Sequence, residues 1–363
     1  MQITFLTTDI TQIGGVERVL CKLCNFMVKE YNYNIKIISL YKPKRDKVYF
    51  SLDNRVSIKY LNVESNTSNM SCIKRILNQI SMISAVKTGL KNEKFDIVVT
   101  TNTMLGVASA LNKKHINGKI IASEHGDYYY FGRVWRYARK KLYNRLDKVI
   151  VLTEKDKIIY EDFLNNIDVI ANPLPFETEK KSNLNSKKIL SAGRLEEEKG
   201  FEYIIEAFSK ISGRYPQWKL EIVGEGSQKE KLLNRVKELK LEDNIYLSNF
   251  TDNIIEKYLD SSIYTLTSKT EAFPLVILEA MECGVPCISF DLAGPKEMIK
   301  NDIDGIIVKQ YDIDELANQL ENMILDEEKR KLFGKKAKEN IQRYSIANIG
   351  VKWKRLFEDI LMQ

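Results

Sequence analysis

The sequence contains few residues of the kinds that hold metal ions or form disulfide bonds. It has two histidines and five cysteines in 363 residues. Two imidazoles are too few for a histidine cluster that could hold a catalytic zinc or iron ion. An odd and sparse set of cysteines disfavours a disulfide framework. Because Cys21 and Cys24 lie far in sequence from Cys283 and Cys287, ordinary buried thiols are favoured over a four-thiolate zinc site.

Long apolar runs are also missing. No run approaches the roughly 20 residues that a membrane-spanning helix requires. Residues 1–6 lead directly into a strand pattern, without the charged-then-apolar order typical of a signal peptide. We therefore expect a cytoplasmic protein. Hydrophobic residues make up 44% of the chain and charged residues 29%, which excludes global disorder, and the length predicts two domains.

Positive charge is concentrated in the first half of the chain. Residues 1–170 carry 27 basic and 16 acidic side chains, whereas the remaining residues carry 29 and 33. This imbalance favours an anionic partner for the first half. Nucleic acid is not expected as that partner, because no nucleic-acid-binding module accompanies the charge.

The segment 132–148 follows four aromatic residues and is strongly basic. Basic side chains beside aromatic rings are typical of a helix that lies on an anionic membrane surface. A solvated basic helix with aromatic residues in the core explains the pattern equally well, and the sequence leaves both interpretations open. The residues concerned are Trp135 and the basic Arg133, Arg136, Arg139, Lys140, Lys141, Arg145 and Lys148.

Short β-rich runs alternate with helical stretches, which predicts an α/β fold with parallel sheets. A polar, lysine-rich segment interrupts the alternation and is predicted to link two domains. We expect a first domain (1–172), the linker (173–187), a second domain (188–343) and a last helix (344–363), whose period leaves open which domain it packs on. The predicted strands are 3–8, 35–40, 95–100, 119–123, 148–152 and 168–171, then 189–192, 220–223, 245–247, 263–267, 287–290 and 306–308.

The first predicted helix follows Gly14 and Gly15. Apolar residues from Val16 to Met27 fall on one face at helical spacing, and Glu17 lies off that face. The two glycines expose backbone amides at a helix N-terminus, where an anion can approach. Glycine at a turn between strand and helix also has a purely geometric explanation, and the pair alone does not decide.

Polar residues and glycines follow several predicted strands directly. In parallel α/β sheets, ligands bind outside the carboxyl ends of the strands. Two domains that each offer such an edge are expected to face each other across a cleft that holds the chemistry. The residues are Gly14-Gly15, Glu124-His125-Gly126, Gly193-Arg194, Gly224-Glu225-Gly226 and Glu271.

Arg194 and Lys199 flank three glutamates just before a predicted helix. Two cations near a helix N-terminus suit a diphosphate, because the guanidinium binds two oxygens and the ammonium adds a point charge. Pairing with Glu196, Glu197 and Glu198 is the alternative, and the spacing favours neither.

The segment 270–281 contains the most informative pattern. Pro274 suits the first turn of a helix, which places Glu271 in the preceding loop and Glu279 inside the helix. Amides near Leu275 and Val276 would then point at an anion. Glu279 lies in an apolar run and needs partners, which ribose hydroxyls would supply. The alternative is a glutamate exposed at an edge.

Together these motifs resemble the retaining glycosyltransferases of family 4, whose GT-B architecture consists of two Rossmann-like domains. The resemblance covers essentially the whole chain. It is strongest in residues 193–200, in Glu271 and Glu279 with seven residues between them, and in residues 280–286. Residues 14–17 and 304–308 also fit.

The resemblance implies a role for each motif. Arg194 and Lys199 would hold the donor diphosphate, and Glu279 would hold the ribose. Glu271 would contact the hydroxyls of the donor sugar, and His125 would line the cleft near the anomeric carbon. The family often has glycine after Phe273, where this chain has Pro274, which removes one amide from the phosphate-facing turn. The remaining residues expected to bind the donor are Gly14, Gly15, Gly224, Phe273, Leu275 and Val276.

We therefore expect transfer of a hexose or N-acetylhexosamine from a nucleotide sugar, UDP-linked, to a glycan acceptor with retention of configuration. The best analogy for the acceptor is a lipid-linked glycan of a bacterial surface polysaccharide, such as capsule, O-antigen or exopolysaccharide, at the inner face of the plasma membrane. The alternatives are a nucleotide-sugar epimerase of the same architecture and a non-catalytic sugar-binding protein. A dinucleotide oxidoreductase is disfavoured, because residues 224–229 lack the third glycine of its fingerprint.

No metal or other cofactor is expected. Asp302-Ile303-Asp304 and Asp312-Ile313-Asp314 look like the Asp-x-Asp pair with which other glycosyltransferases hold a divalent cation. Asp304 precedes a glycine at a turn, and Asp312 or Asp314 is well placed to cap a helix. We therefore favour structural roles for both pairs, with Arg194 and Lys199 in place of the metal.

Overall fold

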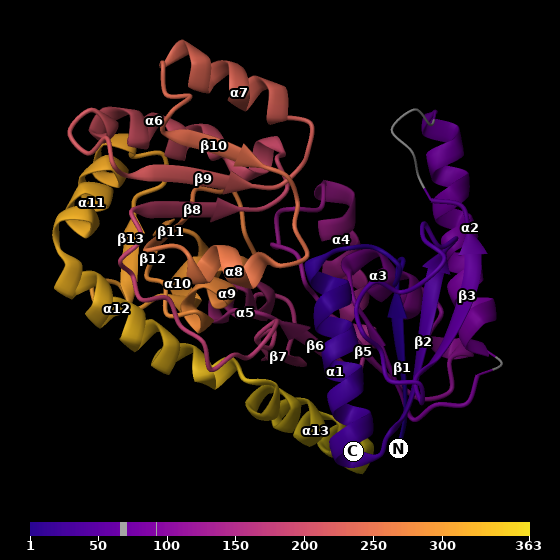
Figure 1. Ribbon diagram of the computed structural model, residues 1–363. Helices are drawn as coiled ribbons and strands as arrows, with labels where there is room; N and C mark the ends of the chain where they lie inside the picture. The colour runs from indigo at the N-terminus through magenta and orange to yellow at the C-terminus, as the bar shows by residue number, and fades with distance from the viewer. Residues whose placement is uncertain (66–70, 92) are drawn as a thin grey trace. The chain divides into compact units, whose positions relative to one another are not determined.

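The computed structural model describes residues 1–65, 71–91 and 93–363 (Figure 1). The chain divides into two compact units. The first consists of Met1–Pro173 and Ile346–Gln363, and the second of Leu174–Ser345. Each unit contains one parallel sheet with helices, so the predicted α/β class with two parallel-sheet domains is confirmed.

The first unit contains a seven-stranded sheet in the order β3-β2-β1-β4-β5-β6-β7, and all of its strand pairs are parallel. Six strands match predicted ones within two residues. Strand β3 was not predicted; it is an edge strand with a mixed polar pattern, and most of its residues are half-buried. The strands are β1 (Gln2–Thr7), β2 (Asn34–Tyr41), β3 (Ser57–Val63), β4 (Ile97–Thr100), β5 (Lys119–Ser123), β6 (Lys148–Val151) and β7 (Ile167–Val169).

Helices connect these strands and cover the sheet. Helix α3 contacts both α2 and α4, so the three lie side by side, and α1 contacts the last helix, α13. No helix among the described residues is long and apolar enough to cross a membrane. The helices of this unit are α1 (Gly15–Tyr31), α2 (Cys72–Lys91), α3 (Thr103–Leu111), α4 (Arg133–Leu142), α5 (Glu154–Glu161) and α13 (Ile346–Met362).

Helix α1 confirms the predicted apolar stripe but corrects the position of one residue. Val19, Leu20 and Met27 are buried, as their spacing predicts. Glu17 was expected off this face, yet it is buried as well. Its side chain turns back over the preceding loop, so that Oε2 lies only 2.4 Å from the place of a Cβ atom on Gly14.

The second unit contains a six-stranded parallel sheet in the order β10-β9-β8-β11-β12-β13, which is the 3-2-1-4-5-6 order of dinucleotide-binding Rossmann folds. All six strands match predicted ones within one residue. The strands are β8 (Lys188–Ala192), β9 (Lys219–Val223), β10 (Ile245–Ser248), β11 (Ile263–Leu266), β12 (Cys287–Phe290) and β13 (Gly305–Val308). The helices are α6 (Phe201–Ser212), α7 (Lys229–Glu238), α8 (Ile254–Leu259), α9 (Leu275–Glu282), α10 (Ala293–Met298), α11 (Ile313–Leu325) and α12 (Glu327–Asn340).

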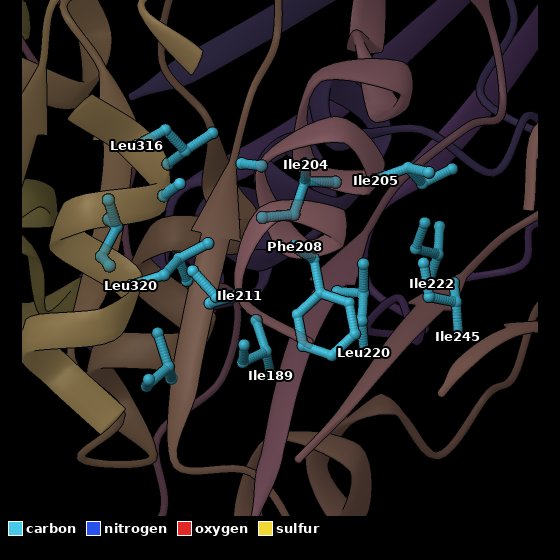
Figure 2. Close-up of a cluster of buried hydrophobic side chains, with 14 of the residues drawn as sticks. Ile189, Ile204, Ile205, Phe208, Ile211, Leu220, Ile222, Ile245, Leu316 and Leu320 are labelled. Atoms are coloured by element: carbon cyan, nitrogen blue, oxygen red, sulfur yellow. The ribbon is translucent and has the colours of Figure 1, made fainter. Parts of the chain in front are cut away.

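The core of the second unit lies between its sheet and helices α6 and α11. Figure 2 shows Phe208 of α6 beside Leu220 of β9, with Leu320 of α11 on the other side of the cluster. Each of these side chains is completely buried. Burial of a large apolar side chain contributes about 1.5–3 kcal/mol, so this cluster fixes the helices on the sheet and the strand ends with them.

The segment 173–187, predicted as a linker, packs against the second unit. Ser182 donates a hydrogen bond through Oγ to the carbonyl of Ser261 (2.7 Å), and its amide donates to the carbonyl of Cys283 (2.8 Å). Leu184 is buried. The change of domain along the chain therefore falls at Pro173 and Leu174, before the lysine-rich residues.

Helix α13 belongs to the first unit, although it follows the second in sequence. Gly350 of α13 lies against Phe26 of α1, and a Cβ atom at residue 350 would be 2.1 Å from the ring. Trp353 and Phe357 are buried on the same helix. The chain thus crosses back, and its last helix completes the first domain.

Gly350→Ala tests this packing, because the substitution lowers the stability of the first domain if α13 packs on α1 and raises it if α13 does not. Alanine favours a free helix by about 1 kcal/mol over glycine, whereas the clash with Phe26 should cost about 1–3 kcal/mol. We expect a lower urea midpoint for the first domain, and a recovered midpoint for Gly350→Ala with Phe26→Ala. Gly132→Ala in the same unit, where the added methyl meets open space, is the control. A stabilised Gly350→Ala variant would show that α13 does not pack on α1.

Candidate functional site

The carboxyl ends of β8, β9 and β11 bring the predicted donor-binding residues of the second unit together. Strand β8 lies between β9 and β11. Arg194 follows β8, Gly224 follows β9, and Glu271 follows β11. Because all strands of this sheet are parallel, the three residues lie at the same edge, where ligands of such folds bind.

Lys199 and Glu271 form an ion pair at this edge, with Lys199 Nζ 2.6 Å from Glu271 Oε1. The same oxygen accepts a hydrogen bond from Ser268 Oγ (2.9 Å). Both charged side chains are largely buried, whereas Ser268 is completely buried at the end of β11. Ser268 was not predicted from the sequence, and its hydrogen bond holds Glu271 in place from the sheet side.

Arg194 extends into solvent, with 71% of its side chain exposed. Its Nη2 lies 3.1 Å from Glu198 Oε1, an ion pair between residues four apart in the same loop. Both predicted cations therefore pair with a carboxylate, but only Arg194 pairs with one of the neighbouring glutamates. An exposed pair of this kind contributes less than about 1 kcal/mol, so the guanidinium remains available to an anion.

Two glycines allow the backbone of this edge to approach closely. At Gly224 a Cβ atom would lie 1.9 Å from the carbonyl oxygen of Gly193, so only glycine fits there. Gly200 has φ 60° and would place a Cβ atom 2.2 Å from the carbonyl oxygen of Thr267. The loop that contains Lys199 consequently lies directly against the end of β11.

Helix α9 begins at the same edge after Pro274, and no side chain caps its N-terminus. Leu275 and Val276, the first two helical residues, are half-buried, and their amides have no carbonyl partner within the helix and so can bind a ligand. Phe273 instead turns inward, where its ring packs edge-on against Tyr344 at 5.5 Å. Phe273 therefore supports this loop from the interior of the second unit.

Glu279 lies one turn into α9 and is buried. Its Oε2 accepts a hydrogen bond of 2.8 Å from the hydroxyl of Tyr258 in α8. Burial and the nearby Glu279 raise the pKa of the Tyr258 hydroxyl well above its ordinary value, so it stays a donor at neutral pH. Glu279 therefore has a protein partner, Tyr258, that was not predicted from the sequence.

The first unit has its own group of polar residues at the carboxyl end of β1. Asp9 is completely buried; its Oδ1 accepts hydrogen bonds from the amide (2.9 Å) and hydroxyl (2.6 Å) of Thr11. Gly14 caps α1 without a side chain, and Glu17 folds over it. Burial, with a smaller contribution from Asp9, raises the pKa of Glu17 to about 7.

His125 follows β5 in the first unit and points into its interior. Its Nε2 lies 3.2 Å from Ser123 Oγ, and Trp353 of α13 lines the same small cavity. Burial lowers the pKa of the imidazole to about 4, although a hydrogen bond with Asn172 opposes this shift. His125 is therefore neutral at physiological pH.

Two family models cover most of the chain. The one described as "Glycosyltransferase Family 4" matches residues 13–177, and the one described as "Glycosyl transferases group 1" matches residues 176–340. An "uncharacterized glycosyltransferase" of Haemophilus influenzae is 30% identical over 359 residues, which are 97% of this chain and 99% of that protein. The chain belongs to glycosyltransferase family 4.

A second relative of this transferase has a more specific name. It is the GalNAc-alpha-(1->4)-GalNAc-alpha-(1->3)-diNAcBac-PP-undecaprenol alpha-1,4-N-acetyl-D-galactosaminyltransferase of Campylobacter jejuni, 26% identical with 99% of each chain covered. Sucrose-phosphate synthase from Thermosynechococcus elongatus has a similar fold, with a TM-score of 0.86, 16% identity and 100% of both chains covered. Anabaena HepE in complex with UDP-glucose gives 0.77 and 18%, with 99% of this chain and 100% of that chain covered. The fold of the transferase is therefore GT-B.

The basic segment 132–148 of the transferase needs one correction. Arg139 was expected on a surface, but it is completely buried. Its guanidinium lies 3.4 Å from Glu124 and donates to the Tyr160 hydroxyl and the Tyr128 carbonyl. A buried guanidinium needs such partners because desolvation of a charge is expensive. Arg139 therefore holds α4 against the buried residues near His125. It is not part of an exposed basic surface.

The two Asp-x-Asp pairs have structural partners. Asp312 accepts a hydrogen bond of 3.0 Å from the amide of Glu315 and caps α11, as predicted. Asp304 is buried in a turn, where it accepts from the amide of Lys300 (2.8 Å) and from Asn340 (2.7 Å). Both predicted roles are confirmed.

Glu17→Gln should change the pH dependence of stability. The folded-state pKa of about 7 exceeds the ordinary value of 4.5. Ionisation of Glu17 therefore lowers the free energy of unfolding, and this loss is complete above pH 7. We expect equal stability of variant and wild type at pH 4, and an advantage for the variant that grows to about 3 kcal/mol above pH 7. Urea unfolding at several pH values measures it, with the exposed Glu30→Gln of the same helix as control. A difference that does not vary with pH would contradict the burial argument.

Proposed function

We propose that this transferase moves a hexose or N-acetylhexosamine from a UDP-sugar to a hydroxyl of a lipid-linked glycan, with retention, during synthesis of a bacterial surface polysaccharide. The observation that carries the proposal is the Lys199–Glu271 pair beside Arg194 and the uncapped start of α9. The UDP-glucose complex of a protein with the same fold supports the donor. The name of the Campylobacter relative, which contains a diphospho-undecaprenol, supports the acceptor.

The donor diphosphate would exchange partners with the ion pair. Its oxygens would attract Lys199 away from Glu271, while Arg194 would bind from the solvent side and the amides of Leu275 and Val276 from the helix. Glu271 would then turn its carboxylate to hydroxyls of the donor sugar, still held by Ser268. Diphosphate and sugar recognition would thereby be coupled through one salt bridge.

The reaction follows from this arrangement. The acceptor oxygen forms a bond to the anomeric carbon as the bond between that carbon and the diphosphate oxygen breaks. The acceptor proton passes to the leaving diphosphate, so UDP and the new glycoside are the products. Negative charge grows on the diphosphate in the transition state, where Arg194 and Lys199 stabilise it, and the proposal requires no metal ion. Retention rests on the resemblance to the family.

The acceptor is proposed to reach the enzyme at an anionic membrane surface. On α4, an exposed face carries Arg133, Lys140 and Lys141 together with Val134 and Tyr137. Arg139 lies on the opposite face and does not contribute. Each basic residue near an anionic leaflet adds about 1 kcal/mol, so three would hold the protein weakly and reversibly on the inner face of the plasma membrane.

Thermal unfolding with UDP, GDP, ADP or NAD, each with and without a chelator, tests the donor. A ligand at 100 times its dissociation constant stabilises by about 2.7 kcal/mol, and we expect this only for UDP and independently of chelator. Arg194→Ala with Lys199→Ala should abolish the shift, whereas the exposed Lys335→Ala should retain it. Stabilisation by GDP or ADP alone would show that the donor carries that nucleotide instead of UDP. Stabilisation by NAD alone, or by no nucleotide, would contradict the proposal. The anomeric configuration of the product, by NMR, then tests retention.

Glu271→Gln should affect binding and transfer in opposite directions. Without its carboxylate partner, Lys199 is free for the diphosphate, and loss of an ion pair worth about 1 kcal/mol should tighten UDP binding about fivefold. The transfer rate should fall, because the amide binds sugar hydroxyls less strongly than the carboxylate. Calorimetry with UDP and initial rates with the UDP-sugar give the two values. Weaker UDP binding would show that the Lys199–Glu271 pair does not compete with the diphosphate.

A further inference from the structure

Helix α2 has two halves with different surroundings. In the second half, Met82, Val86 and Leu90 are buried in the core of the first unit. In the first half, four large apolar side chains are exposed at helical spacing. They are Ile73 (72% exposed), Ile76 (53%), Leu77 (60%) and Ile80 (58%).

The polarity of the helix reverses between the halves. The buried stripe, continued toward the N-terminus at helical spacing, reaches Arg75, Asn78 and Gln79, which are polar. The apolar side chains of the first half thus point away from the domain that the helix packs on. Figure 1 shows these first turns projecting beyond the strands of their own sheet. A contiguous apolar patch on a protein surface indicates an interaction site.

The charge around this patch restricts the partner. The chain contains no acidic residue between Glu64 and Glu93, whereas Lys74 lies beside the patch and Lys87 and Lys91 continue its face along the helix. A second copy of the helix would bring like charges together. Four side chains also bury far less surface than the roughly 800 Å² per partner of a stable protein interface. A partner that complements this patch therefore has an apolar interior, which the isoleucine and leucine side chains can enter, and a negatively charged surface, which attracts the basic residues.

The patch lies at the same edge of the first sheet as the basic face of α4. Helix α2 leads into β4 and α4 leads into β6, and helices that connect parallel strands begin at the carboxyl edge. Helix α3 lies between the two. The exposed Tyr129 and Tyr130 precede α4 at this edge, where aromatic rings suit the headgroup level of a bilayer.

We infer that residues 73–80 of α2 insert their apolar face into the headgroup region of an anionic bilayer, beside the electrostatic contact of α4. The inference rests on the proposed function, because a lipid-linked acceptor requires a bilayer at the carboxyl edge of this domain. Insertion by α2 resists salt, whereas attraction by α4 is screened by it. The two contributions can therefore be separated.

The test is co-sedimentation of the full chain with vesicles of phosphatidylethanolamine and phosphatidylglycerol, at low and high salt. Ile76→Ser with Leu77→Ser should lower partitioning at least about tenfold and abolish the binding that survives high salt. Lys140→Gln with Lys141→Gln should weaken binding at low salt only. The exposed Ile158→Ser on α5 is the matched control and should bind like the wild type.

The outcomes separate this inference from the proposed function. The UDP-induced thermal shift, measured on every variant, should be unchanged and shows that the protein is folded. Wild-type protein that responds to UDP but ignores vesicles would overturn the inference and leave the transferase proposal standing. Equal partitioning of the α2 variant and the wild type would overturn it too, as would a dimer, seen by light scattering, that the α2 substitutions dissociate. Vesicle binding without any nucleotide response would instead refute the proposed donor.

Discussion

Parallel pairing of the strands is the constraint on which the site depends. Every strand pair described in either sheet is parallel, so each sheet has one edge at which all strands end and helices begin. That edge collects residues far apart in sequence, such as Lys199 and Glu271. It also collects helix N-termini with unpaired amides. A chain that places glycines and charges after its strands therefore brings cations and unpaired amides, the groups that suit an anion, to one edge of the sheet.

The charges at this edge are paired without a ligand. Lys199 pairs with Glu271, and Arg194 pairs with Glu198. A partly buried lysine without a partner would be costly, so the pairing stabilises the edge when no ligand is bound; in the proposed donor complex a diphosphate would replace the carboxylate. The cost of breaking the internal pair would then be subtracted from the affinity for the proposed nucleoside diphosphate. Under the proposed function, a donor that also offered sugar hydroxyls to the released Glu271 would recover part of that cost, which would favour the complete donor over its product.

Most of the fold could be predicted from the sequence because its strands are apolar runs bounded by glycine or polar turns. Strand β3 lacks such a run, since an edge strand buries little of either face, and it was missed. The site was predictable where motifs place charges after strands. The residues that hold the site in place could not be predicted. Ser268 contacts Glu271 and Tyr258 contacts Glu279, and these contacts arise only when the chain folds. Glu17 escaped prediction because its side chain folds back over Gly14, against its helical position.

Composition also could not separate the two roles of the basic residues on α4. Lys140 and Lys141 point to solvent, whereas the adjacent Arg139 is held by Glu124 and aromatic side chains, with the Tyr128 ring 4.4 Å from its guanidinium. A helix places neighbouring residues 100° apart, so a run of like charges necessarily reaches both faces. One cation is then buried, and it is tolerated only because a carboxylate, a carbonyl and a hydroxyl surround it. Removing that cation would leave the buried carboxyl of Glu124, which directly precedes His125, with the Thr103 and Tyr143 hydroxyls but without its ion-pair partner. The charge of α4 therefore both holds the interior of the first domain and faces the exterior, and only substitutions on the outer face can test the second role.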